Sequence, residues 1–233
     1  MSVGEARRAR LAEPWESARF RRLRVAELFL SLQGEGSRAG LPTVFLRLVG
    51  CALRCRWCDT SWAFREGTWR TLDDLRGAIA AYGVRRLCIT GGEPLLQPSF
   101  APLIRRLLAD GFDVAVETGG DRNIDDVPEG AARIVDVKLP GSRMDGRMDP
   151  ANLARLRSGD EVKFVVSGRA DYERAREIAR GPLAAFRGEI LFGAVHGELA
   201  PADLAEWILE DRLPARMQLQ MHKLLWPGEE RGV

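Results

Sequence analysis

Apolar runs rich in β-branched residues alternate with helical patterns through most of this chain, and this alternation limits its possible folds more than any other feature. The segments between the apolar runs repeat hydrophobic residues at helical spacing. Strands that alternate with helices of this length predict βαβ units and therefore a parallel sheet. The predicted strands are Thr43–Val49, Arg86–Thr90, Asp113–Thr118, Arg133–Lys138, Glu161–Ser167, Glu189–Val195 and Arg216–His222.

Helix start and stop signals support the same reading. Thr71 has the properties of an N-cap, with Asp74 three residues later and an apolar face beyond it. A second apolar helical pattern begins at Phe100 and ends at Gly111. We expect two further helices at Ala170–Arg180 and Pro201–Glu210.

Composition fits one globular domain. The chain has 233 residues, and we expect residues 25–233 to form a single core domain after a basic, flexible leader at residues 1–24. With 35 basic and 33 acidic residues, the formal net charge of +2 gives no sign of a nucleic-acid partner. Residues 1–26 lack the apolar segment of a signal peptide, and no apolar run approaches the roughly 20 residues of a membrane span. We therefore expect a cytoplasmic protein without a membrane partner.

Three closely spaced cysteines are the most specific chemical signal. Cys51, Cys55 and Cys58 stand in CALRCRWCDT with the spacing C-x3-C-x2-C. A structural zinc site and a ferredoxin cluster each normally take four protein ligands. Three thiolates instead indicate a [4Fe-4S] cluster with one iron open to another ligand. The commonest chemistry at such an iron is reductive cleavage of S-adenosylmethionine.

Other roles for the cysteines remain open at this stage. Four cysteines in 233 residues are too few for a disulfide-based scaffold. A zinc site would need a fourth ligand, although neither histidine lies in a local ligand motif. The candidates for that ligand are Cys88, His196 and His222. We interpret Cys88 as a buried strand residue.

Polar side chains gather at the predicted strand ends. In parallel α/β proteins the ligand binds at the carboxyl ends of the strands. Some of these residues will be helix caps or loop residues, but their number predicts a site there. They are Thr90 to Glu93, Glu117, Thr118, Asp136, Lys138, Ser167, His196 and His222.

The string Thr90-Gly91-Gly92-Glu93-Pro94 follows one of these strands. Two glycines allow the backbone to approach a ligand closely. Glu93 can hold a cationic amino group such as that of a methionine moiety. By itself the string is only a turn signal, and its weight comes from its combination with the cysteine motif.

Two further positions suggest a small anionic substrate. Gln33, in LQGEG, offers both a donor and an acceptor to the edge of a heterocycle, but a glycine-rich loop is the alternative. Arg47 lies within the apolar strand VFLRLVG. A substrate carboxylate can pair with its guanidinium through two hydrogen bonds, and a structural salt bridge is the alternative.

The residues around the last cysteine can have a chemical or a purely structural role. Thr60 follows Cys58 by two residues, and its hydroxyl can ligate magnesium, which takes few protein ligands. Helix capping by Asp59 or Thr60 is the structural alternative. Trp57 is placed to shield a cluster from water, and an ordinary surface aromatic is the alternative.

Taken together, these motifs resemble the radical S-adenosylmethionine superfamily and, more narrowly, the 7-carboxy-7-deazaguanine synthase family of the queuosine pathway. The cysteine motif and GGEP are typical of the superfamily, whereas LQGEG, the strand arginine and CDT narrow the resemblance. It extends from about residue 28 to residue 223. The resembling segments are SLQGEGSRAGLPTVFLRLVGCALRCRWCDT, ITGGEPLLQ, VETGG, VDVKLPGS, DEVKFVVS and MQLQMHK.

The resemblance implies a role for individual residues. Cys51, Cys55 and Cys58 would hold the cluster, and Thr60 would ligate Mg²⁺. The substrate contacts would be Leu32, Gln33, Gly34, Arg47 and Thr90. The S-adenosylmethionine contacts would be Gly92, Glu93, Asp136, Val137 and Lys138. Some members have Ser-Pro-Lys where this chain has Asp136-Val137-Lys138. The leader before Arg24 and the tail after Lys223 also differ from the family pattern.

The resemblance also implies a reaction. A radical derived from S-adenosylmethionine would take hydrogen from C6 of 6-carboxy-5,6,7,8-tetrahydropterin, after which the ring contracts and ammonia leaves. No side chain is expected to act as a general base. Such a carbon–nitrogen lyase needs an external one-electron reductant, and its family has an incomplete (β/α)6 barrel of the TIM type and usually forms homodimers.

Two other functions stay possible from the sequence. A glycyl-radical-enzyme activase shares the cysteine spacing and would act on a partner protein. A zinc- or cluster-bearing interaction module would not be an enzyme.

Overall fold

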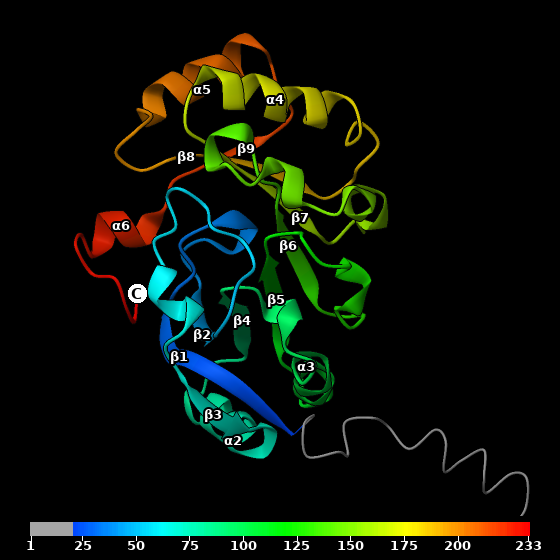
Figure 1. Cartoon of the computed structure of the whole chain (residues 1–233), viewed down its shortest axis with the longest axis vertical. Coiled ribbons are helices and arrows are strands. Elements are labelled where there is room, and N and C mark those ends of the chain that lie inside the picture. The colour runs from blue at the N-terminus through cyan, green and yellow to red at the C-terminus, as the bar shows by residue number, and fades with distance from the viewer. Residues whose placement is uncertain (1–20) are drawn as a thin grey trace, which may run out of the picture.

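A single twisted sheet organises the chain (Figure 1). A computed structural model describes residues 21–233. Within them the sheet has nine strands in the order β3-β1-β2-β4-β5-β6-β7-β8-β9. The strands from β2 onward along this order are mutually parallel, as the sequence predicted. Their bounds are β2 Pro42–Leu48, β4 Arg86–Gly91, β5 Asp113–Thr118, β6 Ala132–Asp136, β7 Glu161–Val166, β8 Glu189–Ala194 and β9 Arg216–Gln218.

Two strands at one edge were not predicted. The strand β1 (Arg22–Leu32) pairs antiparallel with β2 on one side and with the short β3 (Thr68–Thr71) on the other. The predicted leader boundary at residue 24 therefore falls inside a strand, where Leu23 is fully buried. The remainder of the predicted leader, residues 1–20, lies outside the described residues.

Four helices lie close to their predicted positions: α2 (Leu72–Ala81), α3 (Phe100–Ala109), α4 (Arg169–Arg180) and α5 (Pro201–Glu210). The Thr71 hydroxyl accepts a hydrogen bond from the Asp74 amide at 3.1 Å, which confirms the predicted cap. None of the helices in residues 21–233 is both long and apolar enough to cross a membrane.

The predicted last strand is wrong beyond Gln218. The chain leaves the sheet there and forms α6 (Met221–Leu225), so His222 is a helical residue and does not follow a strand end directly. The Met221 amide donates to the carbonyl of Gly34 at 3.1 Å. A partner outside the sheet thus satisfies this amide.

The helical layer is incomplete in the middle of the sheet. The connections β5–β6 and β6–β7 carry only 3₁₀ turns, namely η6 (Ile124–Asp126), η7 (Pro140–Ser142), η8 (Asp145–Arg147) and η9 (Pro150–Arg155). Figure 1 shows α4 and α5 beside one end of the sheet and α2 and α3 beside the other. The predicted class, a partial TIM-like barrel, is confirmed, but regular β/α units occupy only its two ends.

Apolar clusters lie beneath these two helical layers. One joins α2 and α3 to the outward side chains of β2, β4 and β5, and the other joins α4 and α5 to those of β7 and β8. Inside the barrel, Phe29 stacks on Phe45 with ring centroids 5.1 Å apart, next to buried Cys88. Burial of the two outer clusters supplies the main driving force for this fold.

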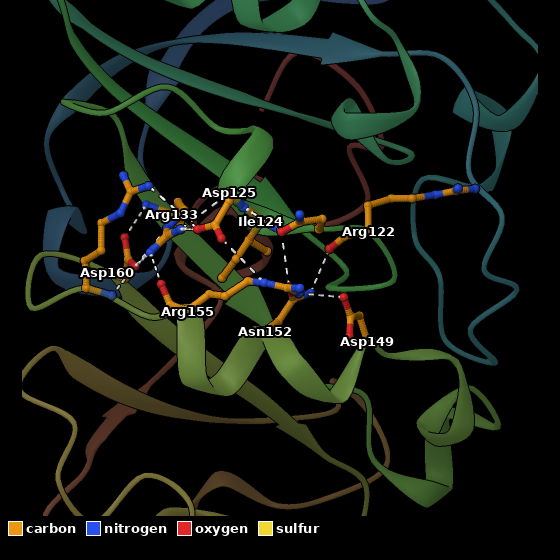
Figure 2. A network of polar contacts seen from close by, with 10 residues as sticks. Arg122, Ile124, Asp125, Arg133, Asp149, Asn152, Arg155 and Asp160 are labelled. Atoms are coloured by element: carbon orange, nitrogen blue, oxygen red, sulfur yellow. Dashed lines mark hydrogen bonds and ion pairs between the residues drawn. The ribbon is translucent and has the colours of Figure 1, made fainter.

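A polar network takes the place of a helix between the two clusters (Figure 2). The guanidinium of Arg133 is fully buried and pairs with Asp160, with Nε 2.9 Å from Oδ2. Its two terminal nitrogens donate to Asp125 at 3.3 Å and to the carbonyl of Arg155 at 2.6 Å. Asn152, fully buried, ties the η9 turn to the β5–β6 connection by donating to the carbonyls of residues 120 and 122. These bonds hold β6 to both of its helix-free connections.

Candidate active site

A cavity of about 290 Å³ opens among the strand ends. Its walls come from the cysteine loop, the ends of β4, β5, β6 and β8, and the segment around α6. Most of the polar residues predicted at the strand ends therefore converge on one space, but Ser167 does not line it and instead donates a hydrogen bond to Asp171 at 2.6 Å. The polar residues that line the cavity include Cys51, Cys55, Cys58, Asp59, Thr60, Thr90, Glu117, Thr118, Asp136, Lys138, Lys163, His196, Glu198, Gln220, His222 and Lys223, with Glu35 among them.

The three motif cysteines share this cavity. Cys51, Cys55 and Cys58 are half-buried and line it, whereas Cys88 is buried in β4 as predicted. Burial raises the pKa of Cys51 to about 11. Its thiol is therefore protonated in the metal-free protein, and a bound metal would displace the proton.

Contacts across the barrel rim fix the cysteine loop. Arg56, between the second and third cysteines, forms two hydrogen bonds with Glu198 at 2.8 and 2.6 Å. Its amide donates to the carbonyl of Ser142 at 3.2 Å. The guanidinium also lies 5.0 Å from the ring of Trp57, which lines the cavity, and the shielding role of Trp57 stays a prediction. The loop is thereby attached to the β6–β7 and β8–α5 connections.

The glycines at the end of β4, Gly91 and Gly92, allow a close contact between backbone segments of the protein, not the predicted contact with a ligand. The Gly92 amide donates to the carbonyl of Leu48 at 3.0 Å, and the Glu93 amide donates to that of Gly50 at 2.6 Å. A side chain at position 92 would collide with the Gly50 carbonyl. The two glycines thus let β4 pack on the start of the cysteine loop, and the contact between Gly92 and S-adenosylmethionine stays a prediction.

Glu93 lies behind the cavity wall. Its carboxylate is fully buried and accepts hydrogen bonds from the amides of Leu95 at 3.1 Å and Gly119 at 2.8 Å and from the Thr118 hydroxyl. Burial outweighs these bonds and raises the pKa of Glu93 to about 7. The predicted contact with an ammonium group, which would favour the ionised form, stays a prediction.

Asp136 and Lys138 stand at the predicted position on the wall. Lys138 Nζ lies 2.7 Å from Asp136 Oδ2, and both side chains line the cavity. The other Asp136 oxygen is buried without a hydrogen-bond partner. Val137 instead packs into the apolar cluster under α4. An unpaired buried oxygen next to an open space suits a polar ligand such as the ribose or amino acid part of S-adenosylmethionine.

A loop closes the other end of the cavity. Residues 33–41 connect β1 to β2 and enter the barrel at the amino ends of the parallel strands. Glu35 there accepts hydrogen bonds from Lys163 at 2.9 Å and from Gln218 and Gln220, each at 3.0 Å. Burial opposes ionisation of Glu35, but the charge and hydrogen bond of Lys163 outweigh it and lower the pKa to about 2. The floor of the cavity therefore carries an ionised carboxylate that is paired with the Lys163 ammonium group.

Several predicted substrate residues surround a second carboxylate. Glu117 accepts hydrogen bonds from the Thr90 hydroxyl at 3.0 Å and from the Gln33 amide at 3.4 Å. Gln33 is buried behind the lining, and Gly34 contacts α6 through its carbonyl. Leu32 ends β1 opposite Pro42. The structure brings Gln33 and Thr90 together, whereas Leu32 and Gly34 shape the loop.

Arg47 has the salt bridge that the sequence left open as an alternative. Its Nε donates to Glu27 Oε1 at 2.7 Å, and both side chains are 14% exposed. Arg47 does not itself line the cavity, but its neighbour in the β2–β4 register, Thr90, does. A contact with a substrate carboxylate stays a prediction.

The hydroxyl of Thr60 is not used for capping. Thr60 precedes the 3₁₀ turn η4 (Ser61–Phe64), and its side chain makes no cap hydrogen bond. Its Oγ1 lies 3.9 Å from Cys58 Sγ, and the residue lines the cavity. Asp59, the other capping candidate, pairs with Lys223 at 3.4 Å. A hard cation beside the cysteines would find an oxygen ligand here.

Comparison with known proteins decides the family. A model described as the Radical SAM superfamily matches residues 46–146. A 7-carboxy-7-deazaguanine synthase of Koribacter versatilis is 41% identical over 226 residues, covering 91% of this chain and 100% of the relative. One from Chlorobaculum tepidum is also 41% identical and covers 91% of this chain and 97% of the relative. The chain belongs to the 7-carboxy-7-deazaguanine synthase family.

Solved structures agree with this membership. The crystal structure of QueE from Escherichia coli superposes with a TM-score of 0.73 at 25% identity, over 85% of this chain and 94% of that one. Streptococcus suis SuiB bound to S-adenosylmethionine, at 14% identity and a TM-score of 0.55, shares the fold. The 7-carboxy-7-deazaguanine synthase family therefore accounts for the partial barrel, and its radical S-adenosylmethionine chemistry implies a [4Fe-4S] cluster and S-adenosylmethionine as cofactors.

The sequence did not predict the residues around Glu35 at the floor of the cavity of this 7-carboxy-7-deazaguanine synthase family member. Glu35 stands in the LQGEG motif itself, yet only its neighbours were assigned a role. Lys163, in the apolar strand EVKFVV, gave the same signal as Arg47, a lone cation within a buried strand. Gln218 and Gln220 gave no usable signal, because the end of the last strand was misplaced.

Proposed function

We propose that this protein converts 6-carboxy-5,6,7,8-tetrahydropterin to 7-carboxy-7-deazaguanine and ammonia, as a carbon–nitrogen lyase of 7-deazapurine and queuosine biosynthesis. The observation that carries this proposal is the 41% identity to a synthase of that name over 91% of this chain and 100% of the relative. The three cysteines on the wall of one cavity support it, since the family reaction begins with a radical. The alternatives, an activase and an interaction module, have no comparable support.

Cys51, Cys55 and Cys58 would hold the [4Fe-4S] cluster, leaving one iron for S-adenosylmethionine. Together these two groups supply, when bound, a one-electron reduction and a radical that abstracts hydrogen. Asp136, with its unpaired oxygen, and Lys138 line the same cavity and would bind S-adenosylmethionine. The Thr60 hydroxyl would ligate Mg²⁺, which would polarise the substrate and fix its pose.

The remaining residues bind and orient the pterin. The ionised carboxylate of Glu35 at the cavity floor would accept hydrogen bonds from the N–H groups of the aminopyrimidine edge. Gln33 and Thr90, held by Glu117, would position the ring from the side. Arg47 would pair with the 6-carboxylate. The walls exclude water from the reacting atoms, so that orientation and fixed charge do the work of the protein.

The setting of the reaction follows from the same resemblance. An external one-electron reductant, a cytoplasmic location that keeps the thiols reduced and a homodimeric assembly complete the proposal. The four cysteines are all free thiols, which fits a reducing compartment.

The test is anaerobic reconstitution with iron and sulfide, followed by incubation with reductant, S-adenosylmethionine and 6-carboxytetrahydropterin. We expect 7-carboxy-7-deazaguanine and ammonia in equal amounts, and much less of both after magnesium is removed by chelation. Cleavage of S-adenosylmethionine without consumption of the pterin would contradict the proposed substrate. Zinc at one equivalent without iron would contradict the enzyme itself.

A further inference from the structure

An irregularity in β1 places a carboxylate beside Arg47. In the β1–β2 ladder Val25 lies opposite Leu48, and Glu27 lies opposite Arg47, so Ala26 is an extra residue in β1. A bulge of this kind turns the following side chains to the other face of a strand. Without it, Glu27 would point in the same direction as Val25, which is buried in the outer apolar cluster.

The packing on both sides of the bulge confirms this change of face. Leu23 and Val25, before the bulge, lie in the outer cluster with α2. After the bulge Phe29, two residues beyond Glu27, stacks on Phe45 inside the barrel, and Leu28 packs outward. The extra residue thus brings Glu27 into the barrel at the position of Arg47.

Glu27 pairs with one side of the guanidinium only. The contact joins Arg47 Nε to Glu27 Oε1 at 2.7 Å. An arginine held through Nε keeps its two terminal nitrogens on the other edge of the plane, where they form the fork that binds a carboxylate through two parallel bonds. Thr90, opposite Arg47 in the next strand, lines the cavity. The backbones of Arg47 and Thr90 are one strand spacing apart, about 4.8 Å, so an anion that contacts Thr90 binds beside the strand that carries Arg47.

The second oxygen of Glu27 is also occupied. It accepts a hydrogen bond from the Gly232 amide at 3.1 Å. The preceding residue, Arg231, forms an ion pair with Glu66 at 2.6 Å. Its guanidinium carbon lies 4.0 Å from the centroid of the Trp62 ring, and that of Arg47 lies 6.0 Å from the same ring. We call residues 226–232 the C-terminal strap. The strap and β2 therefore hold the same carboxylate from two directions.

We propose that Glu27 is a positioning residue for Arg47: it fixes the guanidinium through Nε so that the fork faces the substrate carboxylate, and the C-terminal strap fixes Glu27. The inference rests on the proposed function, because it requires an anionic group of the substrate at Arg47. It adds that the bulge at Ala26 and the strap place the carboxylate that orients that arginine.

The test measures binding to the reconstituted protein by anaerobic calorimetry. The ligands are 7-carboxy-7-deazaguanine and, as a control without the carboxylate, 7-deazaguanine. Glu27→Gln should weaken binding of the first by about tenfold, the loss of one well-placed charge-assisted contact, and change binding of the second by less than about twofold. Glu27→Asp keeps the negative charge on a side chain that is too short to contact Arg47, and it should weaken binding of 7-carboxy-7-deazaguanine by a similar factor. Both should raise KM and leave kcat nearly unchanged.

A double-mutant cycle separates positioning from a general structural role. Arg47→Ala should weaken binding of the carboxylated ligand at least as much as Glu27→Gln, and the double variant should be no weaker than Arg47→Ala alone. Arg231→Ala, which releases the strap, should weaken binding by about threefold by the same route. Glu189→Gln is the matched control, because Glu189 pairs across strands with Arg216 at 3.1 Å on the exposed side of the sheet.

Unchanged or tighter binding in Glu27→Gln would overturn the inference, because Glu27 would then only compete with the ligand carboxylate for Arg47. An equal loss for both ligands would overturn it as well and would assign Glu27 to the fold. If Glu27→Gln does not fold, Glu27→Asp decides by the same criteria. A different result, no loss for either ligand in Arg47→Ala, would remove Arg47 from the proposed function itself.

Discussion

Two buried polar clusters of this molecule differ in how completely their bonds are used. Around Arg133, Nε and both terminal nitrogens have partners within the chain (Figure 2). On the cavity walls, Glu35 faces open space despite its partners, and an oxygen of Asp136 has no hydrogen bond. Saturated polar groups hold the fold, whereas groups with spare bonding capacity beside a cavity are available to a ligand.

The difference follows from the place of each cluster in the fold. The Arg133 network fills the place of the α-helices absent from the β5–β6 and β6–β7 connections. It must therefore be complete without any ligand. The cavity cluster stands where the parallel strands end, and its ligands complete it. Mutations should separate these two roles.

The largest effect is expected at the cysteines. Cys58→Ala should lower product formation by at least about a thousandfold, because the cluster loses one of its three ligands. The thermal midpoint of the metal-free protein should change little, because Cys58 is only half-buried. A product assay and calorimetry measure the two quantities, and iron analysis measures the loss of the cluster. Cys88→Ala is the control and should retain its iron; loss of iron there would contradict our assignment of the ligands.

A large effect on stability alone is expected in the saturated cluster. Asp160→Asn removes the buried carboxylate that pairs with Arg133, leaves only the exposed Asp125 as its counter-ion, and should lower the free energy of unfolding by about 3–5 kcal/mol. Denaturant titration measures this change, with exposed Asp145→Asn as the control. Affinity for 7-carboxy-7-deazaguanine in the folded fraction should stay the same. A loss of affinity larger than the loss of stability would remove the distinction between the two clusters.

The opposite pattern is expected for Glu35→Gln. The lost negative charge should weaken 7-carboxy-7-deazaguanine binding by about tenfold, through the aminopyrimidine edge. In this variant the negative charges of Asp136 and Glu117 still stabilise the ammonium group of Lys163. The free energy of unfolding should therefore fall by only about 1–2 kcal/mol. Because the pKa of Glu35 is about 2, its contribution is constant at neutral pH and is lost only as the pH falls from about 4.5 toward 2. Stability loss exceeding that of Asp160→Asn would reverse the comparison.

The smallest effect concerns Glu93, whose pKa is raised to about 7. The folded protein therefore favours the protonated form, and the stability that this form contributes declines as the pH rises from about 4.5 to 7. An ammonium group of S-adenosylmethionine would favour the ionised form. Affinity should then increase several-fold between about pH 6 and pH 7, with release of up to one proton on binding. Calorimetry in two buffers of different ionisation enthalpy measures both. Glu93→Gln should abolish the pH dependence; its persistence would show that another group is responsible.

The sequence predicted the parts of the molecule that depend on local pattern. The strands with continuous apolar runs and the cap at Thr71 are local properties, and both were found. The antiparallel β1 was missed because its bulge at Ala26 interrupts the alternation of faces that marks a half-buried strand. The end of β9 was misplaced because an amide there pairs with Gly34, almost two hundred residues earlier. Likewise, the partners of Glu35 come from β7 and from the segment before α6, which no local pattern brings together.

The loop at residues 33–41 has a kinetic consequence. It closes the end of the barrel where Glu35 lies, and the cysteines stand at the opposite, open rim. A molecule bound against Glu35 must pass the place where the cofactor would lie. Loading would thus follow a compulsory order, with the pterin first and S-adenosylmethionine second, and the product would leave last. Excess S-adenosylmethionine would then inhibit the enzyme by blocking entry, and this inhibition would be relieved by more pterin.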